Sequence, residues 1–134
     1  DVDRFTSFEG NTGPYILYTI VRIKSILNRY MEAGGKLEAG ELLPASNGSE
    51  KNLMLQLSGF GSMIESAFEE KAPHKICAHI YEVSNAFNSF YHETKILSEE
   101  NQAQKESYIR LLQLTKRVLE TSIDLLGFEA PDKM

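Results

Sequence analysis

The sequence has one cysteine and no tryptophan, and it lacks any apolar run long enough to cross a bilayer. Because Cys77 has no second cysteine to pair with, a disulfide within the chain is excluded, and a reducing, cytoplasmic location is expected. Spanning a bilayer takes about 20 consecutive apolar residues, and a signal peptide has a basic start before an apolar centre. The opening Asp1-Val2-Asp3-Arg4 has no such features. We therefore predict neither secretion by a signal peptide nor a membrane partner.

An excess of positive charge is also missing. The formal net charge is −5, which argues against a protein that coats DNA or RNA without discrimination, so no DNA partner is expected. The cations are nonetheless segregated, because Arg22, Lys24 and Arg29 lie between Pro14 and Tyr30 without an acid among them. Such segregation permits a basic face on an acidic protein, although most charge runs are simply solvated surface.

No stretch alternates apolar and polar residues with the period of two that a half-buried β-strand requires, so no sheet is predicted. Apolar residues recur instead at spacings of three and four, which is typical of helices with one buried face. With 134 residues, the chain has the length of one ordinary domain. We predict an all-α bundle of four main helices, at about 14–33, 50–70, 73–94 and 98–127.

The first predicted helix follows Gly10-Asn11-Thr12-Gly13 and starts at Pro14, whose fixed φ suits the first helical position. Gly34-Gly35 ends it, since glycine accepts a left-handed backbone, and 34–49 is predicted to be an exposed loop. Spacings of four, three and four predict that this helix buries Ile16, Ile20, Ile23 and Leu27.

A second stripe on this helix is predicted to face away from the core and carries Tyr15, Tyr18, Arg22, Ser25 and Arg29. A phenol presents an apolar plane with a polar tip, and a guanidinium pairs with phosphate or stacks on a base. The stripe is therefore suited to unstacked nucleotides. The same pattern fits two tyrosines that fill a groove against a neighbouring helix, which is the commoner arrangement for such a stretch considered alone.

In the second predicted helix, Gly59 and Gly61 each weaken helix formation by roughly 1 kcal/mol relative to alanine, which favours a kink near Phe60. The third begins at Pro73 and leaves Tyr81, Asn88, Tyr91 and His92 off its apolar stripe. The fourth is predicted to be capped by Ser98 and to end at Gly127. The predicted apolar stripe of the second helix is Leu53, Leu57, Phe60, Ile64 and Phe68. That of the third helix is Ile76, Ile80, Val83, Phe87 and Phe90.

Residues that support catalysis or metal binding are sparse. His74 and Cys77 lie three apart on a helix, but His79 lies on a different face and a fourth nitrogen or sulfur ligand is not near in sequence, so no metal is predicted. The chain has no Gly-x-Ser-x-Gly turn. Its Gly10–Gly13 segment lacks the Walker lysine, and a helix cap is the preferred interpretation there. These features favour binding over catalysis.

Three parts of the sequence share a resemblance to one family. They are Phe8–Tyr15 followed by Tyr18, Arg22, Ser25 and Ile26; Pro73-His74 followed by Phe87–Tyr91; and Arg110-Leu111 leading to Leu125–Met134. Together they resemble the C-terminal helical, DALR-type anticodon-binding domain of arginyl-tRNA synthetase. The glycine-rich start and the terminal Gly-x-x-x-Pro-x-x-Met are the most specific, because helix packing alone does not require them. Thr19 departs from the family pattern, which usually has a small apolar residue there.

The resemblance implies that Tyr15, Tyr18 and Met134 contact bases in the anticodon loop of tRNA-Arg. It implies phosphate or base contacts for Arg22 and Arg29, and it places Asn88 and Tyr91 near the same surface. Catalytic residues and a cofactor are not expected within this chain.

The resemblance also implies that residues 1–12 lead in from an upstream catalytic domain and that 13–134 form the anticodon-binding domain. The parent enzyme would attach arginine to tRNA using ATP and magnesium, although the His-x-Gly-His and lysine-rich ATP-binding signatures are absent from this sequence. The alternative is a helical protein-interaction module without an RNA role, in which the aromatic stripe docks a partner helix.

Overall fold

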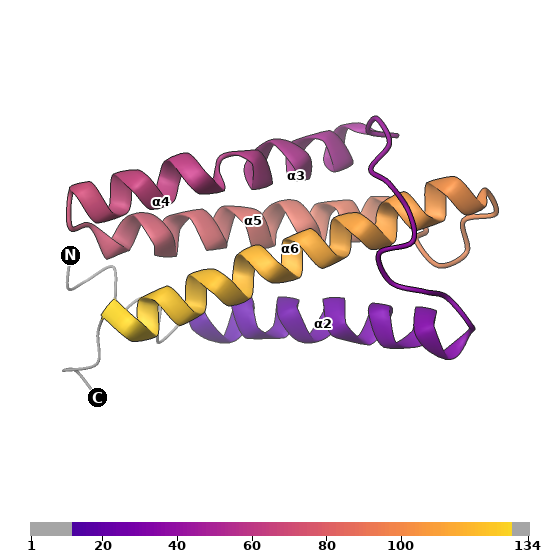
Figure 1. The fold of residues 1–134 in the computed structure, drawn as a ribbon, viewed down its shortest axis with the longest axis horizontal. Coiled ribbons are helices and arrows are strands. Elements are labelled where there is room, and N and C mark those ends of the chain that lie inside the picture. The colour runs from indigo at the N-terminus through magenta and orange to yellow at the C-terminus, as the bar shows by residue number, and fades with distance from the viewer. Residues whose placement is uncertain (1–11, 130–134) are drawn as a thin grey trace.

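A computed structural model describes residues 12–129, which fold entirely into helices and connecting segments (Figure 1). The helices are α2 (Gly13–Glu32), α3 (Gly48–Ser58), α4 (Phe60–Glu69), α5 (Pro73–Glu93) and α6 (Gln102–Glu129). The predicted all-α class is confirmed, with the second predicted helix divided into α3 and α4. Met134 and the leading segment 1–12, apart from Thr12, lie outside the described residues.

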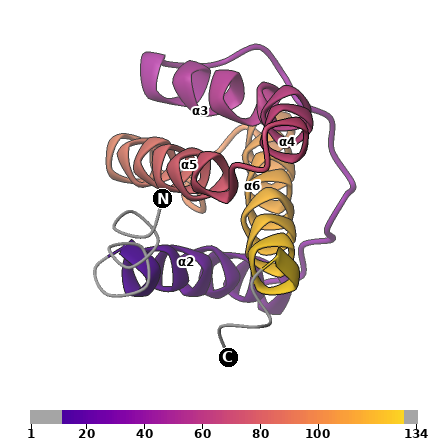
Figure 2. The same cartoon turned by 90° about the vertical axis from the view of Figure 1, so that its left-hand side faces the viewer.

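Helix α5 is the centre of the bundle, since it packs against α2, α3, α4 and α6. Helix α6 crosses the others obliquely, and the end-on view in Figure 2 shows it passing along one side of α2 and α5. Helix α2 therefore contacts both α5 and α6. The seam between α2 and α5 is where the predicted aromatic stripe meets a second helix.

The apolar stripes predicted for α2 and α5 form a large part of the core. All four predicted residues of α2 and all five of α5 are buried, and Leu111, Leu112 and Leu119 from α6 are fully enclosed with them. Each such side chain contributes roughly 1.5–3 kcal/mol through burial. The helical periodicity is thus a correct guide to the interior of these two helices.

The second predicted helix is interrupted at Gly59, which ends α3 and precedes α4. The predicted kink near Phe60 is confirmed, but the single buried stripe is wrong: Leu53 is buried, whereas Phe68 is 48% exposed. His79 of α5 lies at the break, with its Nε2 2.9 Å from the carbonyl oxygen of Gln56. Because the helix is interrupted at Gly59, α4 does not continue the helical repeat of α3. The two helices therefore do not share one continuous apolar face.

The predicted ends of the fourth helix also need correction. Helix α6 begins at Gln102 rather than after Ser98, because the Asn101 side chain accepts the N–H of Gln104 at 2.9 Å and caps it. The helix continues through Gly127 to Glu129, since a single glycine costs a helix only about 1 kcal/mol. At the end of α2, Gly34 has a φ of 96°, as predicted for a left-handed cap.

The connection from α2 to α3 is mostly exposed but is fastened to α6. The Glu38 N–H donates to the Gln113 side chain at 3.0 Å, and the Leu43 N–H donates to the Ser107 hydroxyl at 2.9 Å. Gly40 lies directly against Glu106, so a Cβ there would collide with it. These contacts hold the connection in place along α6.

A buried carboxylate fixes the start of α3. Glu50 is fully buried and accepts hydrogen bonds from the N–H and the hydroxyl of Ser46, at 2.6 and 2.7 Å. The Asn47 side chain caps the same helix by accepting the Glu50 N–H at 2.8 Å. The Ser46 hydroxyl also lies 3.0 Å from that of Tyr108, which ties this helix start to α6.

Among the helices of residues 12–129, none combines the length and the hydropathy that crossing a membrane requires.

Candidate nucleic-acid interface

Four polar side chains of α2 and α5 meet at the seam around Asn88. The Tyr15 hydroxyl donates to Asn85 Oδ1 at 2.7 Å and accepts from Asn88 Nδ2 at 3.1 Å. The same Asn88 amide lies 3.0 Å from the hydroxyl of Thr19, which in turn donates to the Tyr15 carbonyl oxygen. Asn88 therefore connects two turns of α2 to α5.

Tyr15 does not face away from the core, so that part of the prediction is wrong. Its ring packs against the hydrophobic core, and its hydroxyl lies in the seam. The ring of Tyr81, which is 42% exposed, lies 5.9 Å away in a tilted arrangement. The reason is that α5 lies beside α2 on this side, so the stripe of α2 is partly covered.

Arg22 lies between two tyrosine rings. Its Cζ is 4.1 Å from the centroid of the Tyr91 ring and 4.9 Å from that of Tyr18. One terminal nitrogen donates to Asn88 Oδ1 at 2.7 Å, and the other donates to the Tyr18 hydroxyl at 2.8 Å. A guanidinium has five N–H donors, so Arg22 retains donors beyond these two bonds while it fixes the position of Tyr18.

Tyr18 is the most accessible aromatic side chain of this arrangement, with 55% of its surface exposed. Leu17 and Val21, at 56% and 61%, lie beside it along α2 and extend the apolar surface. Tyr91 is more enclosed, because the Phe87 ring stacks 6.3 Å from it. The Tyr18 ring is thus accessible to a ligand, whereas the more buried Tyr91 ring packs against the Arg22 guanidinium. We term Tyr15, Tyr18, Arg22, Asn88 and Tyr91 the seam cluster.

Arg29 lies outside the seam cluster but next to it, two helical turns beyond Arg22. It lines an open pocket of about 270 Å³, termed here the Tyr91 pocket, together with Tyr91 and the connection from α5 to α6. Met134, the remaining predicted contact residue, lies outside the described residues. Of the seven predicted site residues, the structure brings five together in one cluster and places Arg29 beside them.

Sequence reasoning named Thr19 and Tyr81 but not as site residues, and it did not name Asn85. A signal for the two α5 residues exists, because Tyr81, Asn85, Asn88 and His92 follow one another at spacings of four, three and four. Such spacing places polar and aromatic side chains on one face of a helix. Thr19 is fully buried, and its hydroxyl receives the Asn88 amide where an apolar residue would leave that donor unpaired.

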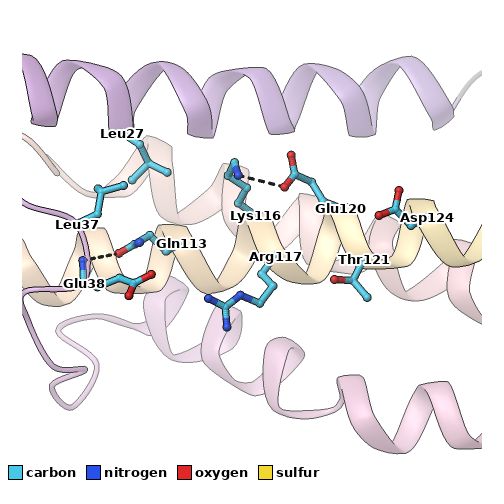
Figure 3. Close-up of a pocket in the computed structure, with 9 residues that line it drawn as sticks. All are labelled: Leu27, Leu37, Glu38, Gln113, Lys116, Arg117, Glu120, Thr121 and Asp124. Carbon is cyan, nitrogen blue, oxygen red and sulfur yellow. Dashed lines mark hydrogen bonds and ion pairs between the residues drawn. The ribbon is translucent and has the colours of Figure 1, made fainter.

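A second hollow, of about 350 Å³, lies between α2 and α6 and is shown in Figure 3. Acids line it beside the cations Lys116 and Arg117: Glu120 pairs with Lys116 at 3.1 Å, and it also pairs with Lys24 of α2 at 3.2 Å. Partial burial raises the pKa of Glu120, but hydrogen bonds and charge from the two lysines outweigh it, and the pKa is lowered overall. Because Glu38 and Asp124 also line this hollow, it is poorly suited to an anion.

Metal binding finds no support among the described residues. Between residues 12 and 129, no three or more histidine, cysteine, aspartate or glutamate side chains gather where they could hold an ion. Cys77 is buried, and His79 serves the break between α3 and α4.

Comparison with known proteins identifies similar sequences. The DALR anticodon binding domain family matches residues 16–134. The whole chain is 67% identical to part of the arginine–tRNA ligase of Agathobacter rectalis, and 53% and 42% identical to parts of those of Alkaliphilus oremlandii and Maricaulis maris. It spans only 23%, 23% and 22% of the lengths of these relatives.

Proposed function

Because the chain belongs to the DALR anticodon-binding domain family, we propose that it holds the anticodon loop of a tRNA for arginine. The relatives that match its full length are arginine–tRNA ligases, which supports arginine as the amino acid of the cognate tRNA. Sequence-specific RNA recognition generally uses unstacked bases of single-stranded loops, which stack on aromatic rings or guanidinium planes. The exposed Tyr18 ring of the seam cluster offers such a surface, and Arg22 places its N–H donors beside it.

The observation that carries this proposal is the arrangement of Tyr18, Arg22 and Tyr91. The Arg22 guanidinium packs on the Tyr91 ring and donates a hydrogen bond to Asn88. It donates a second hydrogen bond to the Tyr18 hydroxyl. The Tyr18 ring is therefore preorganised before RNA arrives, and its exposed surface offers a stacking plane. Rigid positioning reduces the entropy that binding would otherwise cost.

The other predicted residues take separate roles in this proposal. Tyr15 supports the surface through its bonds to Asn85 and Asn88 and borders Tyr81. The remaining N–H groups of Arg22, and the exposed Arg29, supply contacts to phosphate. Met134 is proposed to pack on a base, since a thioether side chain is apolar and polarizable.

We further propose that the chain acts within a longer arginine–tRNA ligase. There it would hold the anticodon loop so that the acceptor end of the tRNA reaches a catalytic domain that uses ATP, magnesium and arginine. The support is the share of the relatives' length that the chain spans, together with the absence of ATP-binding signatures from its sequence.

The test is a binding measurement with a tRNA for arginine and with the same tRNA carrying altered anticodon bases, each at about 50 and 200 mM salt. Tighter binding to the unaltered anticodon is expected, together with a loss of affinity at the higher salt. Equal weak binding to both would contradict base recognition by this chain. No binding at low salt would contradict the RNA function altogether.

A protein-interaction module is the second candidate, and the exposed Leu17 and Val21 favour it. Both are aliphatic and more than half exposed beside Tyr18, as expected for a face that docks a partner helix. Free tRNA would not compete with such a partner, whereas it would occupy the surface under the RNA proposal. Competition by tRNA therefore separates the two functions.

A further inference from the structure

The Tyr91 pocket opens where α5 ends and the chain turns toward α6, at the end of the bundle where α2 also ends (Figure 1). Buried Ile26 and Ile96 provide part of its lining. Polar side chains provide much of the rest, including Arg29, Lys95 and Ser98. The pocket thus combines an apolar wall with charged and hydroxyl groups.

The charge of this pocket is of one sign. Arg29 and Lys95 line it, and an aspartate or glutamate does not. Both cations are exposed, and within residues 12–129 neither side chain has an ion pair or a hydrogen bond. The nearby carboxylate of Glu99 accepts the N–H of Asn101 at 3.1 Å. Unopposed cations around a concave surface raise the local concentration of anions.

The α2–α6 hollow shows the opposite arrangement. There Lys116 pairs with Glu120, and Glu38 and Asp124 line the same space (Figure 3). Lys24 of α2 pairs with the same Glu120. Of these two hollows, only the Tyr91 pocket has no aspartate or glutamate in its lining.

The hydroxyl groups of the Tyr91 pocket fit the same kind of ligand. The Thr94 hydroxyl oxygen accepts the Asn47 side-chain amide at 3.0 Å, which leaves its own O–H as a donor. Ser98 adds a second O–H. Phosphate oxygens are strong acceptors, and they match the planar donor fork of an arginine such as Arg29.

The pocket adjoins the seam cluster through one side chain. The Tyr91 ring lines the pocket and also lies 4.1 Å from the Arg22 guanidinium. Arg22 and Arg29 are seven residues apart on α2, which places them on one side of the helix at a rise of about 10 Å. A strand that puts a base on Tyr18 would therefore carry its backbone past this pocket.

We propose that the Tyr91 pocket binds a backbone phosphate of the RNA strand whose base is held at Tyr18, with Arg29 and Lys95 as its charged ligands. This inference rests on the proposed function. It adds Lys95, Thr94 and Ser98 to the interface and assigns them to the phosphate rather than to base recognition.

The test uses the 134-residue chain with the two charges removed, R29Q/K95Q, and a matched control with two exposed charges removed elsewhere, K71Q/R117Q. Lys71 lies between α4 and α5, and Arg117 lines the α2–α6 hollow. Affinity for the anticodon stem-loop of a tRNA for arginine is measured over a range of salt, with the unaltered and with an altered anticodon. Circular dichroism and thermal unfolding check that both variants fold.

The R29Q/K95Q variant is expected to bind about tenfold more weakly to both RNAs and to reduce the slope of log affinity against log salt by about 0.7–0.9, the value for one phosphate. The control is expected to retain the slope. Inorganic phosphate should compete with the stem-loop more strongly than chloride at equal ionic strength, and this excess should be lost in R29Q/K95Q.

Two results would overturn the phosphate assignment while the proposed function stands: an R29Q/K95Q variant that behaves like the control, or one that loses discrimination between the anticodons. Failure of the unsubstituted chain to bind either RNA would instead overturn the proposed function itself.

Discussion

Asn88 holds Arg22 in place through a hydrogen bond of 2.7 Å from the guanidinium to its side-chain oxygen. The amide nitrogen of the same Asn88 side chain reaches the hydroxyls of Tyr15 and Thr19. One residue of α5 therefore fixes three side chains of α2, and the exposed ring of Tyr18 depends on it through Arg22. This dependence gives Asn88 a positioning role that can be separated from direct contact with RNA.

Replacing Asn88 by alanine is expected to release Arg22 and thereby to weaken RNA binding about fivefold, the equivalent of about 1 kcal/mol. The free energy of unfolding should also fall by about 1–3 kcal/mol, because buried partners lose their hydrogen bonds. Calorimetric binding and urea unfolding measure the two effects. Asn52→Ala, at an exposed position of α3, is the control. Unchanged RNA affinity in folded Asn88→Ala would contradict the positioning role.

Replacing Tyr18 by alanine is expected to cost about 1–3 kcal/mol of RNA binding if a base stacks on the ring. Tyr18→Phe keeps the ring and should retain most of the affinity. Phe68→Ala on α4 is a suitable control, because Phe68 is 48% exposed and Tyr18 is 55% exposed. Equal affinities for the Tyr18→Ala and Phe68→Ala variants would remove Tyr18 from the interface.

Glu50 is expected to matter for stability rather than for binding. Its fully buried carboxylate accepts two hydrogen bonds from Ser46, and Glu50→Ala would remove the acceptor of both, leaving the Ser46 N–H without it and the Ser46 hydroxyl with only Tyr108. The expected loss in the free energy of unfolding is about 1–3 kcal/mol, measured by urea denaturation. The exposed Glu41→Ala serves as the control and should change stability by no more than about 0.5 kcal/mol. A comparable small change for Glu50→Ala would show that the Ser46 bonds are dispensable.

The pairing of Glu120 with Lys24 and Lys116 is expected to make stability depend on pH. The pKa of Glu120 is lowered in the folded state from an ordinary value of 4.5, so the stabilisation is complete above pH 4.5 and is lost as the pH falls through the lowered pKa. Glu120→Gln should therefore lower the free energy of unfolding at pH 7 by at most about 1 kcal/mol. The difference from the unsubstituted chain should shrink in strongly acidic solution, and a constant difference at every pH would exclude the ion pairs as its cause. Asp124→Asn, in the same hollow, is the control.

Replacing two glycines by alanine should change the free energy of unfolding in opposite directions. Gly34 has a φ of 96°, so Gly34→Ala strains the backbone and is expected to cost about 1 kcal/mol. Gly61 lies in α4 with open space where a Cβ would point, and Gly61→Ala should gain about 0.5–1 kcal/mol. Thermal unfolding of both variants measures the effect, and a stabilised Gly34→Ala would contradict the left-handed cap.

The periodicity of the sequence determined the helical class and the buried faces of α2 and α5, because each face follows from spacings of three and four within one segment. The glycines of the sequence determined the stop at Gly34 and the weakness at Gly59, because both are local properties of glycine. The sequence did not determine that α6 starts at Gln102, since Ser98 and Asn101 are both adequate caps, and packing selects between them.

The tertiary structure alone decided how the candidate interface is assembled. In the sequence, Tyr15, Tyr18 and Arg22 belong to one helix, and Asn88 and Tyr91 belong to another. Arg22 and Asn88 are 66 residues apart along the chain. Whether those two stripes meet depends on how α2 packs against α5, which no pattern within either helix specifies. The packing of α2 against α5 places the Tyr15 hydroxyl in the seam, leaves Tyr18 exposed and positions Arg22 between two tyrosine rings. The hydrogen bonds and ring contacts across the seam form only once both helices are in place.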